Sequence, residues 1–289
     1  MTDAACDWPA PAKLNLMLRV VGRRPDGYHE LQTVFQFLDR GDRIRLHPTR
    51  SPEIHCRTHL PGVPDEANLA VRAARLLQRH AGVRRGVVLE IHKALPMGGG
   101  LGGGSSNAAT VLVALNRLWG VGLPFDELAR LGRRLGADVP IFVYGRAAWA
   151  EGIGDRLTPL APKEPWYLVI RPPCQVSTAE IFGHPRLTRN APPITIRDFL
   201  AGRIENTIEP LVRELHPEVA RALDWLQGHT RGRLTGTGSC VFGEFPHREA
   251  AAKALAGLPA DMEGFVSRGC NLSPLHRQLQ RMNGVSPSG

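Results

Sequence analysis

The stretch from Pro96 to Ala109 holds the residues whose types and spacing most clearly suggest chemistry. It reads P-M-G-G-G-L-G-G-G-S-S-N-A-A, and glycine occupies six of the seven positions from Gly98 to Gly104. Glycine reaches positive φ angles and lets the backbone approach a ligand with no Cβ in the way. Successive free N–H groups then form a cradle for an anion. The stretch is therefore predicted to bind phosphate.

Two common kinds of phosphate loop do not fit this stretch. A Walker A loop contains a Gly-Lys pair, and the sequence has none. Gly98, Gly100 and Gly103 satisfy the pattern G-x-G-x-x-G, but so glycine-rich a run does so by chance. A dinucleotide-binding fingerprint also needs a strand leading straight into the loop and an acidic residue about 20 positions later. Here Pro96 intervenes, and Asp126 begins what is predicted to be another helix.

Two more polar residues could act on a bound phosphate, although each has a simpler explanation. In the strand predicted at 10–21, leucines alternate with Lys13 and Asn15, so both polar side chains point away from the buried face. A lone lysine there is typically solvated. Asp138 stands two positions before Pro140, which is typical of a helix N-cap. A carboxylate near a phosphate loop can also take a proton from a substrate hydroxyl.

Three further residues could contact a nucleotide or a flat ligand. Tyr28 and His29 follow a turn at 24–27, where they suit stacking and hydrogen bonding or, equally, the packing of the turn itself. Lys93 lies near the end of a strand that leads to the glycine stretch. A solvated lysine and a nucleotide contact are both consistent with that position.

Hydrophobic periodicity predicts the elements that position these residues. Helices are expected at 68–80, from Ser105 or Ser106 onward, and at 124–135, 211–226 and 250–258. Strands are expected at 10–21, 34–38, 43–60, 87–95, 167–170 and 264–275, and a loop of small residues at 234–242 leads into another strand. Prolines 159, 162 and 165 mark a domain boundary, so we predict domains at 1–160 and 161–289.

The composition narrows the class of protein. The chain has 289 residues, 43% hydrophobic and 22% charged, which is ordinary for a globular protein. No apolar run reaches membrane-spanning length, and residues 1–11 lack the features of a secretory signal, so a cytoplasmic location is expected. The five cysteines are odd in number and dispersed, which argues against disulfides and structural zinc. His55, Cys56 and His59 match no usual zinc spacing. The net charge of +9 is spread over short arginine clusters, which favours a solvated surface.

Several segments together resemble one known family. The run from Pro96 to Ser106 resembles the ATP loop of the GHMP kinases. The segments P-A-P-A-K-L-N-L (9–16), D-G-Y-H (26–29), G-A-D-V-P (136–140), L-T-G-T-G-S-C-V-F (234–242) and N-L-S-P-L-H (271–276) follow the order of the branch that phosphorylates 4-diphosphocytidyl-2-C-methyl-D-erythritol. The resemblance spans residues 8–276. It implies an α+β fold with a ribosomal protein S5 domain 2-like N-terminal domain and a ferredoxin-like C-terminal domain, with the active site between them.

The resemblance also implies a reaction, transfer of the γ-phosphoryl group of ATP to the 2-hydroxyl of that substrate in the non-mevalonate route to isoprenoid precursors. Lys13 and Asp138 would be catalytic: Asp138 accepts or orients the hydroxyl proton, and Lys13 stabilises the negative charge. The residues implied for ATP are Asn68, Lys93, Pro96, Met97, Gly98, Gly99, Gly100, Leu101, Gly102, Gly103, Gly104, Ser105 and Ser106. Those implied for the substrate are Asn15, Tyr28, His29, Thr178 and Phe182.

Partners and rival functions follow from the same reasoning. Mg²⁺ is expected to bridge phosphate oxygens; its protein ligand stays unassigned, with Ser106 as one candidate. We expect a monomer or weak homodimer, with no nucleic acid and no membrane as partner. One rival is another GHMP kinase, acting on homoserine or mevalonate. The other is a nucleic-acid-binding module whose glycine loop grips backbone phosphate, which the net charge of +9 permits.

Overall fold

A computed structural model describes residues 6–284 of the chain. The expectation about a missing secretory signal rests on residues 1–11, of which 1–5 lie outside the described residues. None of the helices in the described part combines the length and the apolar character that crossing a membrane requires.

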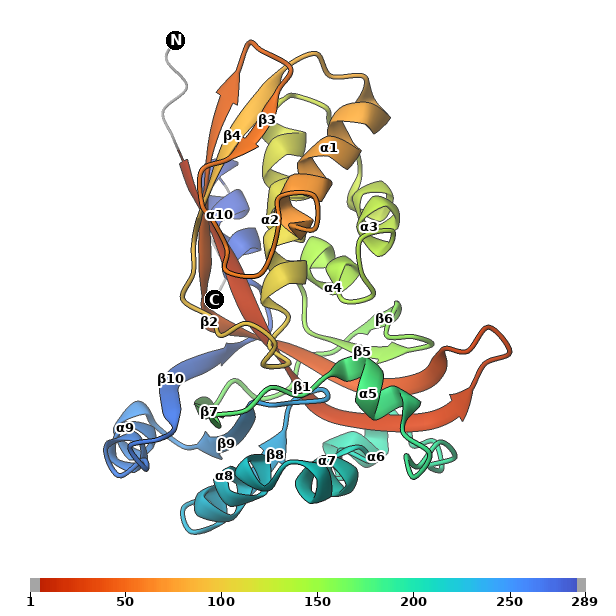
Figure 1. The fold of residues 1–289 in the computed structure, drawn as a ribbon, viewed down its shortest axis with the longest axis vertical. Coiled ribbons are helices and arrows are strands. Elements are labelled where there is room, and N and C mark those ends of the chain that lie inside the picture. The colour runs from red at the N-terminus through yellow and green to blue at the C-terminus, as the bar shows by residue number, and fades with distance from the viewer. Residues whose placement is uncertain (1–5, 285–289) are drawn as a thin grey trace.

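The longest element of the fold is an antiparallel hairpin formed by β1 (Cys6–Arg23) and β2 (His29–Thr49). It extends from beside α2 and α10, and its curved half passes α5 toward a tip at the right of the view (Figure 1). The sheet has the order β3-β4-β2-β10-β7-β9-β8, while β1 and β5 also pair with β2, and β6 pairs with β5. The remaining strands are β3 (Ile54–Cys56), β4 (Gly86–His92), β5 (Ala148–Glu151), β6 (Arg156–Pro159), β7 (Trp166–Arg171), β8 (Gly232–Leu234), β9 (Val241–Phe245) and β10 (Glu263–Cys270).

Helices cover the sheet in two groups at opposite ends of the hairpin (Figure 1). One group packs on β1, β2 and β4 around a core that includes Trp8, Phe37 and Leu112. The other packs mainly on β7, β8 and β9 around Leu168 and Leu223, except for residues 196–200, where Phe199 belongs to a third core with Leu16 and Val169. The first group comprises α1 (Leu69–Ala81), α2 (Gly103–Leu118), α3 (Phe125–Arg133), α4 (Val139–Tyr144) and α10 (Pro274–Met282). The second comprises α5 (Thr178–Gly183), α6 (Ile196–Leu200), α7 (Glu209–Leu215), α8 (Pro217–Gln227) and α9 (Arg248–Ala256).

This arrangement confirms the predicted α+β class, and most of the expected elements are present. The predicted domain boundary falls in the loop between β6 and β7. The division into domains 1–160 and 161–289 stays a prediction.

Four predicted elements differ from the structure. α2 begins at Gly103, before the serines, because its N-cap is the left-handed Gly102. The helix expected at 211–226 is two helices, because a proline follows His216 and disfavours helical geometry there. The strand expected at 43–60 ends at Thr49, and β3 is separate. The C-terminal strand ends at Cys270, and α10 follows it unpredicted.

Candidate active site

The glycine stretch forms one wall of a cavity of about 640 Å³ between the two groups of helices. The middle of β1 and the first residues of α2 form further walls. The remaining walls are α5, the two residues before α4, and the loop between β8 and β9. Of the residues predicted to bind ligands, the structure places these on the cavity wall: Lys13, Asn15, Asn68, Lys93, Pro96, Met97, Gly98, Gly99, Gly100, Leu101, Gly102, Gly103, Gly104, Ser105, Asp138, Thr178 and Phe182.

Lys13 lies at the centre of this cavity. Its Nζ donates to Asn15 Oδ1 at 2.5 Å and to the Gly100 carbonyl at 2.9 Å, and it lies 3.4 Å from Asp138 Oδ2. Lys13 and Asn15 therefore share a face, as the alternation predicts. That face is buried rather than solvated, with only 4% of the Lys13 side chain exposed. A buried ammonium beside a carboxylate can stabilise developing negative charge strongly, because the surroundings screen it little.

Asn15 joins the strand to the loop between β8 and β9. Its backbone N–H donates to Thr235 Oγ1 at 3.0 Å, and its Nδ2 donates to Thr33 Oγ1 at 2.8 Å. Thr33, on β2, and Thr235 are contacts that the sequence reasoning did not assign. Thr33 fixes the side-chain amide of Asn15 so that its Oδ1 faces Lys13, and Thr235 holds the backbone of the strand at this point.

Asp138 occupies the N-cap position of α4 but does not act as a cap. Its φ and ψ are −83° and −9°, in the helical region, and its side chain accepts no capping hydrogen bond. The N-cap position was therefore predicted correctly, whereas the capping role was not. The carboxylate faces Lys13 and is 35% exposed, so it is accessible to a substrate. A carboxylate in this position can accept a proton from a substrate hydroxyl.

The glycine loop packs against the β8–β9 loop so closely that side chains would not fit. An ideal Cβ on Gly100 would lie 2.5 Å from the Thr235 carbonyl, and φ is +75°. The loop ends at Gly102, the N-cap of α2, and no side chain caps the first turn of that helix. The first N–H groups of α2 therefore remain free, and the residues that carry them line the cavity. A phosphate fits there, because the helix N-terminus carries partial positive charge.

Gly102→Ala is expected to raise the KM for ATP at least about tenfold. Alanine at φ +73° costs roughly 1–2 kcal/mol, and its Cβ would lie 2.8 Å from the Phe142 ring and 3.2 Å from Lys13 Cε. Steady-state kinetics checks this. Gly120→Ala is the matched control, since Gly120 has φ +69° with no atom within 4 Å of its Cβ position and lies outside the cavity wall. An equal KM change in both variants would contradict the prediction.

Lys93 is held by a buried carboxylate that sequence reasoning missed. Its Nζ forms an ion pair with Asp42, whose side chain is fully buried on β2. Asp42 Oδ1 also accepts from the backbone N–H groups of Ala94 at 2.8 Å and Leu95 at 2.9 Å. Asp42 thus fixes the chain that leads into the glycine loop. No local pattern marks this residue, because its partners lie about 50 positions away.

Three residues predicted to bind the nucleotide, Asn68, Ser105 and Ser106, differ in their surroundings. Asn68 lies on the cavity wall and caps α1, with its Oδ1 accepting from the N–H of Ala70 at 3.0 Å. Ser105 also lines the cavity, but Ser106 is fully buried and does not. Within the described residues, the Ser106 hydroxyl has no hydrogen-bond partner.

The expected substrate side is a small aromatic and polar group. Phe182 lines the cavity and stacks on His29, with ring centroids 5.0 Å apart. His29 Nε2 accepts from Arg189 Nε at 3.0 Å, and burial together with the charge of Arg189 lowers the pKa of His29. Thr178 is bonded to Thr237, hydroxyl to hydroxyl, at 2.9 Å.

Two of the predicted substrate residues do not line the cavity. His29 lies behind Phe182, and Tyr28 is 60% exposed at the hairpin turn. Arg189, which sequence reasoning missed, holds His29 and also donates to the carbonyls of Phe182 and His184. Its position depends on a loop that folds back over α5.

An uncapped helix N-terminus and a glycine loop, facing a buried lysine paired with an accessible aspartate, are typical of kinases that phosphorylate a hydroxyl of a small molecule. The comparisons with known proteins agree. Residues 68–146 match the model of the GHMP kinases N terminal domain, and residues 195–264 match that of the GHMP kinases C terminal domain.

Individual relatives narrow the family. The chain is 56% identical over 272 residues to 4-diphosphocytidyl-2-C-methyl-D-erythritol kinase of Pseudomonas syringae pv. syringae (strain B728a), covering 94% of this chain and 96% of that protein. A crystal structure of 4-(cytidine 5'-diphospho)-2C-methyl-D-erythritol kinase is 36% identical, with a TM-score of 0.81 and coverage of 91% and 99%. Mevalonate kinase of Methanococcus jannaschii, 17% identical with a TM-score of 0.70 and coverage of 94% and 100%, shares the fold alone.

The chain belongs to the GHMP kinases and, within them, to the 4-diphosphocytidyl-2-C-methyl-D-erythritol kinase family. The fold class and the family resemblance expected from the sequence are thereby confirmed.

Proposed function

We propose that this enzyme transfers the γ-phosphoryl group of ATP to the 2-hydroxyl of 4-diphosphocytidyl-2-C-methyl-D-erythritol, giving the 2-phosphate and ADP. Relatives with this name cover almost the whole chain. The observation that carries the chemistry is the contact of 3.4 Å between Lys13 Nζ and Asp138 Oδ2, beside the glycine loop. We further propose that the enzyme acts in the cytoplasm, as a monomer or weak homodimer.

Each part of the cavity has a separate task in this proposal. The glycine loop and the free N–H groups of α2 hold the ATP phosphates. Asp138 accepts the proton of the 2-hydroxyl while the hydroxyl oxygen bonds to the γ-phosphorus. The bond between that phosphorus and the β–γ bridging oxygen breaks, and ADP leaves. Asn15 and the Gly100 carbonyl hold the Lys13 ammonium beside Asp138 and the reacting oxygen. Catalysis then consists of positioning and charge stabilisation.

The residues of the cavity also fit a magnesium ion that is bound mainly through phosphate. Among residues 6–284, no three His, Cys, Asp or Glu side chains cluster as a metal site. Mg²⁺ suits such a site, because it usually keeps waters and phosphate oxygens as ligands. Asn107 lines the cavity, and its buried Oδ1 has no hydrogen-bond partner in the described part of the chain. Asn107 and Ser105 would hold the ion, which would neutralise phosphate charge. The fully buried Ser106 is less suited to this role.

The cytidine end of the substrate is assigned to the group formed by His29, Phe182 and Tyr28. The Phe182 ring, supported from behind by the buried imidazole of His29, offers an apolar surface on the cavity wall, and the exposed Tyr28 ring can cover a base from outside. Arg189 positions His29. This group would select the cytidylated substrate over smaller alcohols.

An assay of ADP release tests the proposal directly. With ATP and Mg²⁺, we expect kcat/KM for the cytidylated substrate to exceed that for homoserine, mevalonate or galactose by at least about 10³-fold. Those alcohols have no cytidine to contact the residues assigned to it. Preference for homoserine or mevalonate would instead support another GHMP kinase. Nucleic-acid binding that survives physiological salt and is not displaced by ATP would contradict the proposal.

A further inference from the structure

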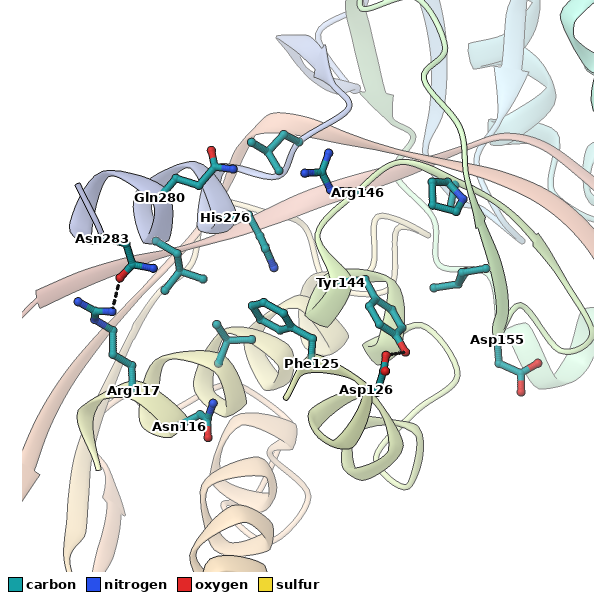
Figure 2. A pocket seen from close by; sticks show the side chains of 16 residues that line it. Asn116, Arg117, Phe125, Asp126, Tyr144, Arg146, Asp155, His276, Gln280 and Asn283 are labelled. Atoms are coloured by element: carbon teal, nitrogen blue, oxygen red, sulfur yellow. Dashed lines mark hydrogen bonds between the residues drawn. The ribbon is translucent and has the colours of Figure 1, made fainter. Parts of the chain in front are cut away.

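A second cavity, of about 770 Å³, lies at the far ends of two helices that begin at the catalytic cavity. α2 starts at the glycine loop, and Val113, Asn116 and Arg117 near its other end line this second cavity. α4 starts beside Asp138 and ends at Tyr144, which also lines it. Figure 2 shows the remaining walls, which come from α3, α10 and the segment around β5 and β6. The two cavities share no lining residue.

Two large aromatic rings are left partly uncovered in this cavity. Phe125 is 43% exposed and Tyr144 is 36% exposed. Phe125 packs against the ring of His276, with centroids 5.2 Å apart. Leu157, Leu272 and other apolar side chains complete the lining. A concave surface with exposed rings and aliphatic walls suits a planar apolar body, which would gain more from burial there than on a convex surface.

Among the described residues that line this cavity, two arginines, Arg117 and Arg146, face one carboxylate without an ion pair, Asp126, so the cavity keeps a small positive surplus. Asp155 is paired with Arg133 at 2.6 Å, and Asp126 accepts a hydrogen bond from the Tyr144 hydroxyl at 2.9 Å. Arg117, in contrast, has the neutral Asn283 Oδ1 as its partner. The Arg146 side chain makes no hydrogen bond or ion pair with any residue in the described part of the chain. Its guanidinium is therefore available to a ligand.

His276 adds a neutral polar group between Arg146 and the aromatic rings. It is more than nine-tenths buried, its Nδ1 is bonded to Ser273 Oγ at 3.0 Å, and its ring points toward Phe125 (Figure 2). Its Nε2 is buried and makes no hydrogen bond within residues 6–284. Burial lowers the pKa of His276 to about 4, a hydrogen bond of the ring with the Val143 backbone acts in the opposite direction, and the charge of Arg146 lowers the pKa further. At neutral pH the ring therefore offers a hydrogen bond without charge. An unpartnered buried polar atom is costly unless a ligand satisfies it.

We propose that this cavity is a second ligand site, which binds a small organic anion with a planar apolar body. Arg146 binds the anionic group, His276 Nε2 makes a hydrogen bond beside it, and the rings of Phe125 and Tyr144 contact the apolar body. Carboxylates, sulfonates and phosphates on an aromatic ring have this chemistry. The site is separate from the one assigned to ATP and substrate, so the proposal does not depend on the proposed function.

Fluorescence titration with 1-anilinonaphthalene-8-sulfonate tests the site. The full chain is saturated with a non-hydrolysable ATP analogue so that the catalytic cavity is filled. A second titration uses N-phenyl-1-naphthylamine, which has the same rings without the sulfonate. We expect saturable binding of the sulfonate. Arg146→Gln should weaken it about tenfold, as expected for a charge-assisted hydrogen bond, and should change the Kd of the neutral probe less than twofold.

Two further variants make the outcome decisive. Phe125→Ala should weaken the binding of both probes, because both need the ring surface. Phe125 is partly exposed, so the fold should be kept, and circular dichroism checks this. Arg248→Gln on α9 removes the same charge from an exposed site outside the cavity and should change neither Kd. Equal affinity of the sulfonate for wild type and Arg146→Gln would overturn the proposal. So would the absence of saturable sulfonate binding by the chain that is saturated with the ATP analogue.

Discussion

Asp138→Asn is expected to lower kcat by about 10²–10⁴-fold while the KM for ATP stays nearly unchanged. The amide cannot accept the hydroxyl proton and removes the negative charge that lies 3.4 Å from Lys13 Nζ. Binding of the ATP phosphates depends instead on the glycine loop and α2. Because the Asp138 side chain makes no capping bond to α4, the substitution should cost the fold little. Single-turnover and steady-state kinetics separate the chemical step from binding.

Asp224→Asn is the matched control for this variant. Asp224 is an exposed carboxylate on α8, and its partner is Arg213. Its replacement removes the same charge at a site outside the cavity, so kcat should not change. If Asp138→Asn is folded and turns over at a normal rate, Asp138 is not the proton acceptor and the proposed mechanism is wrong.

Lys13→Met is expected to lower kcat by about 10²–10³-fold, since it removes one preorganised charge from the reacting centre. Methionine matches the length and apolar stem of lysine, so the packing against Phe35 and Gly102 is largely kept. The Asn15 Oδ1 and the Gly100 carbonyl lose their donor, so the glycine loop should loosen and the KM for ATP should rise. Lys13→Met should therefore change both constants, whereas Asp138→Asn changes mainly kcat.

Lys253→Met makes the same chemical change at an exposed position on α9 and should leave both constants unaltered. Thermal unfolding shows whether Lys13→Met is folded. If it is folded and its kcat is normal, the ammonium has no catalytic role. A pure stability loss would lower the melting temperature without changing the rate per folded molecule.

Local chemistry explains why much of this site could be predicted from the sequence. A run of glycines before an apolar-periodic segment is sufficient to predict a phosphate cradle at a helix N-terminus. Alternation along 10–21 places Lys13 and Asn15 on one face, and the hydrogen bond between them agrees. The unpredicted α10 also had a local signal, since Ser273 caps it and Pro274 stands at its first position.

Contacts between distant segments account for what local patterns missed. Asp42 lies in the run D-R-G-D-R (39–43), where nothing distinguishes it from Asp39, yet it binds Lys93 and the two N–H groups that follow Lys93. Arg189 and His29 are 160 positions apart and meet only because the loop after α5 returns to the hairpin. The second cavity likewise needs α2, α4 and α10 together.

The sequence by itself thus predicted the phosphate loop, and its motifs identified the family, which implied the α+β class and the two residues proposed for catalysis, because motifs depend on residue types at short spacing. Only the tertiary structure decided that Lys13 is buried, since the glycine loop and the β8–β9 loop cover a strand face that alternation alone would leave in solvent. Only the packing of α4 on α2 and α3 placed the Asp138 carboxylate beside Lys13, where the sequence pattern indicates a helix cap. Burial and pairing depend on which distant surfaces meet, and periodicity within one segment carries no information about that.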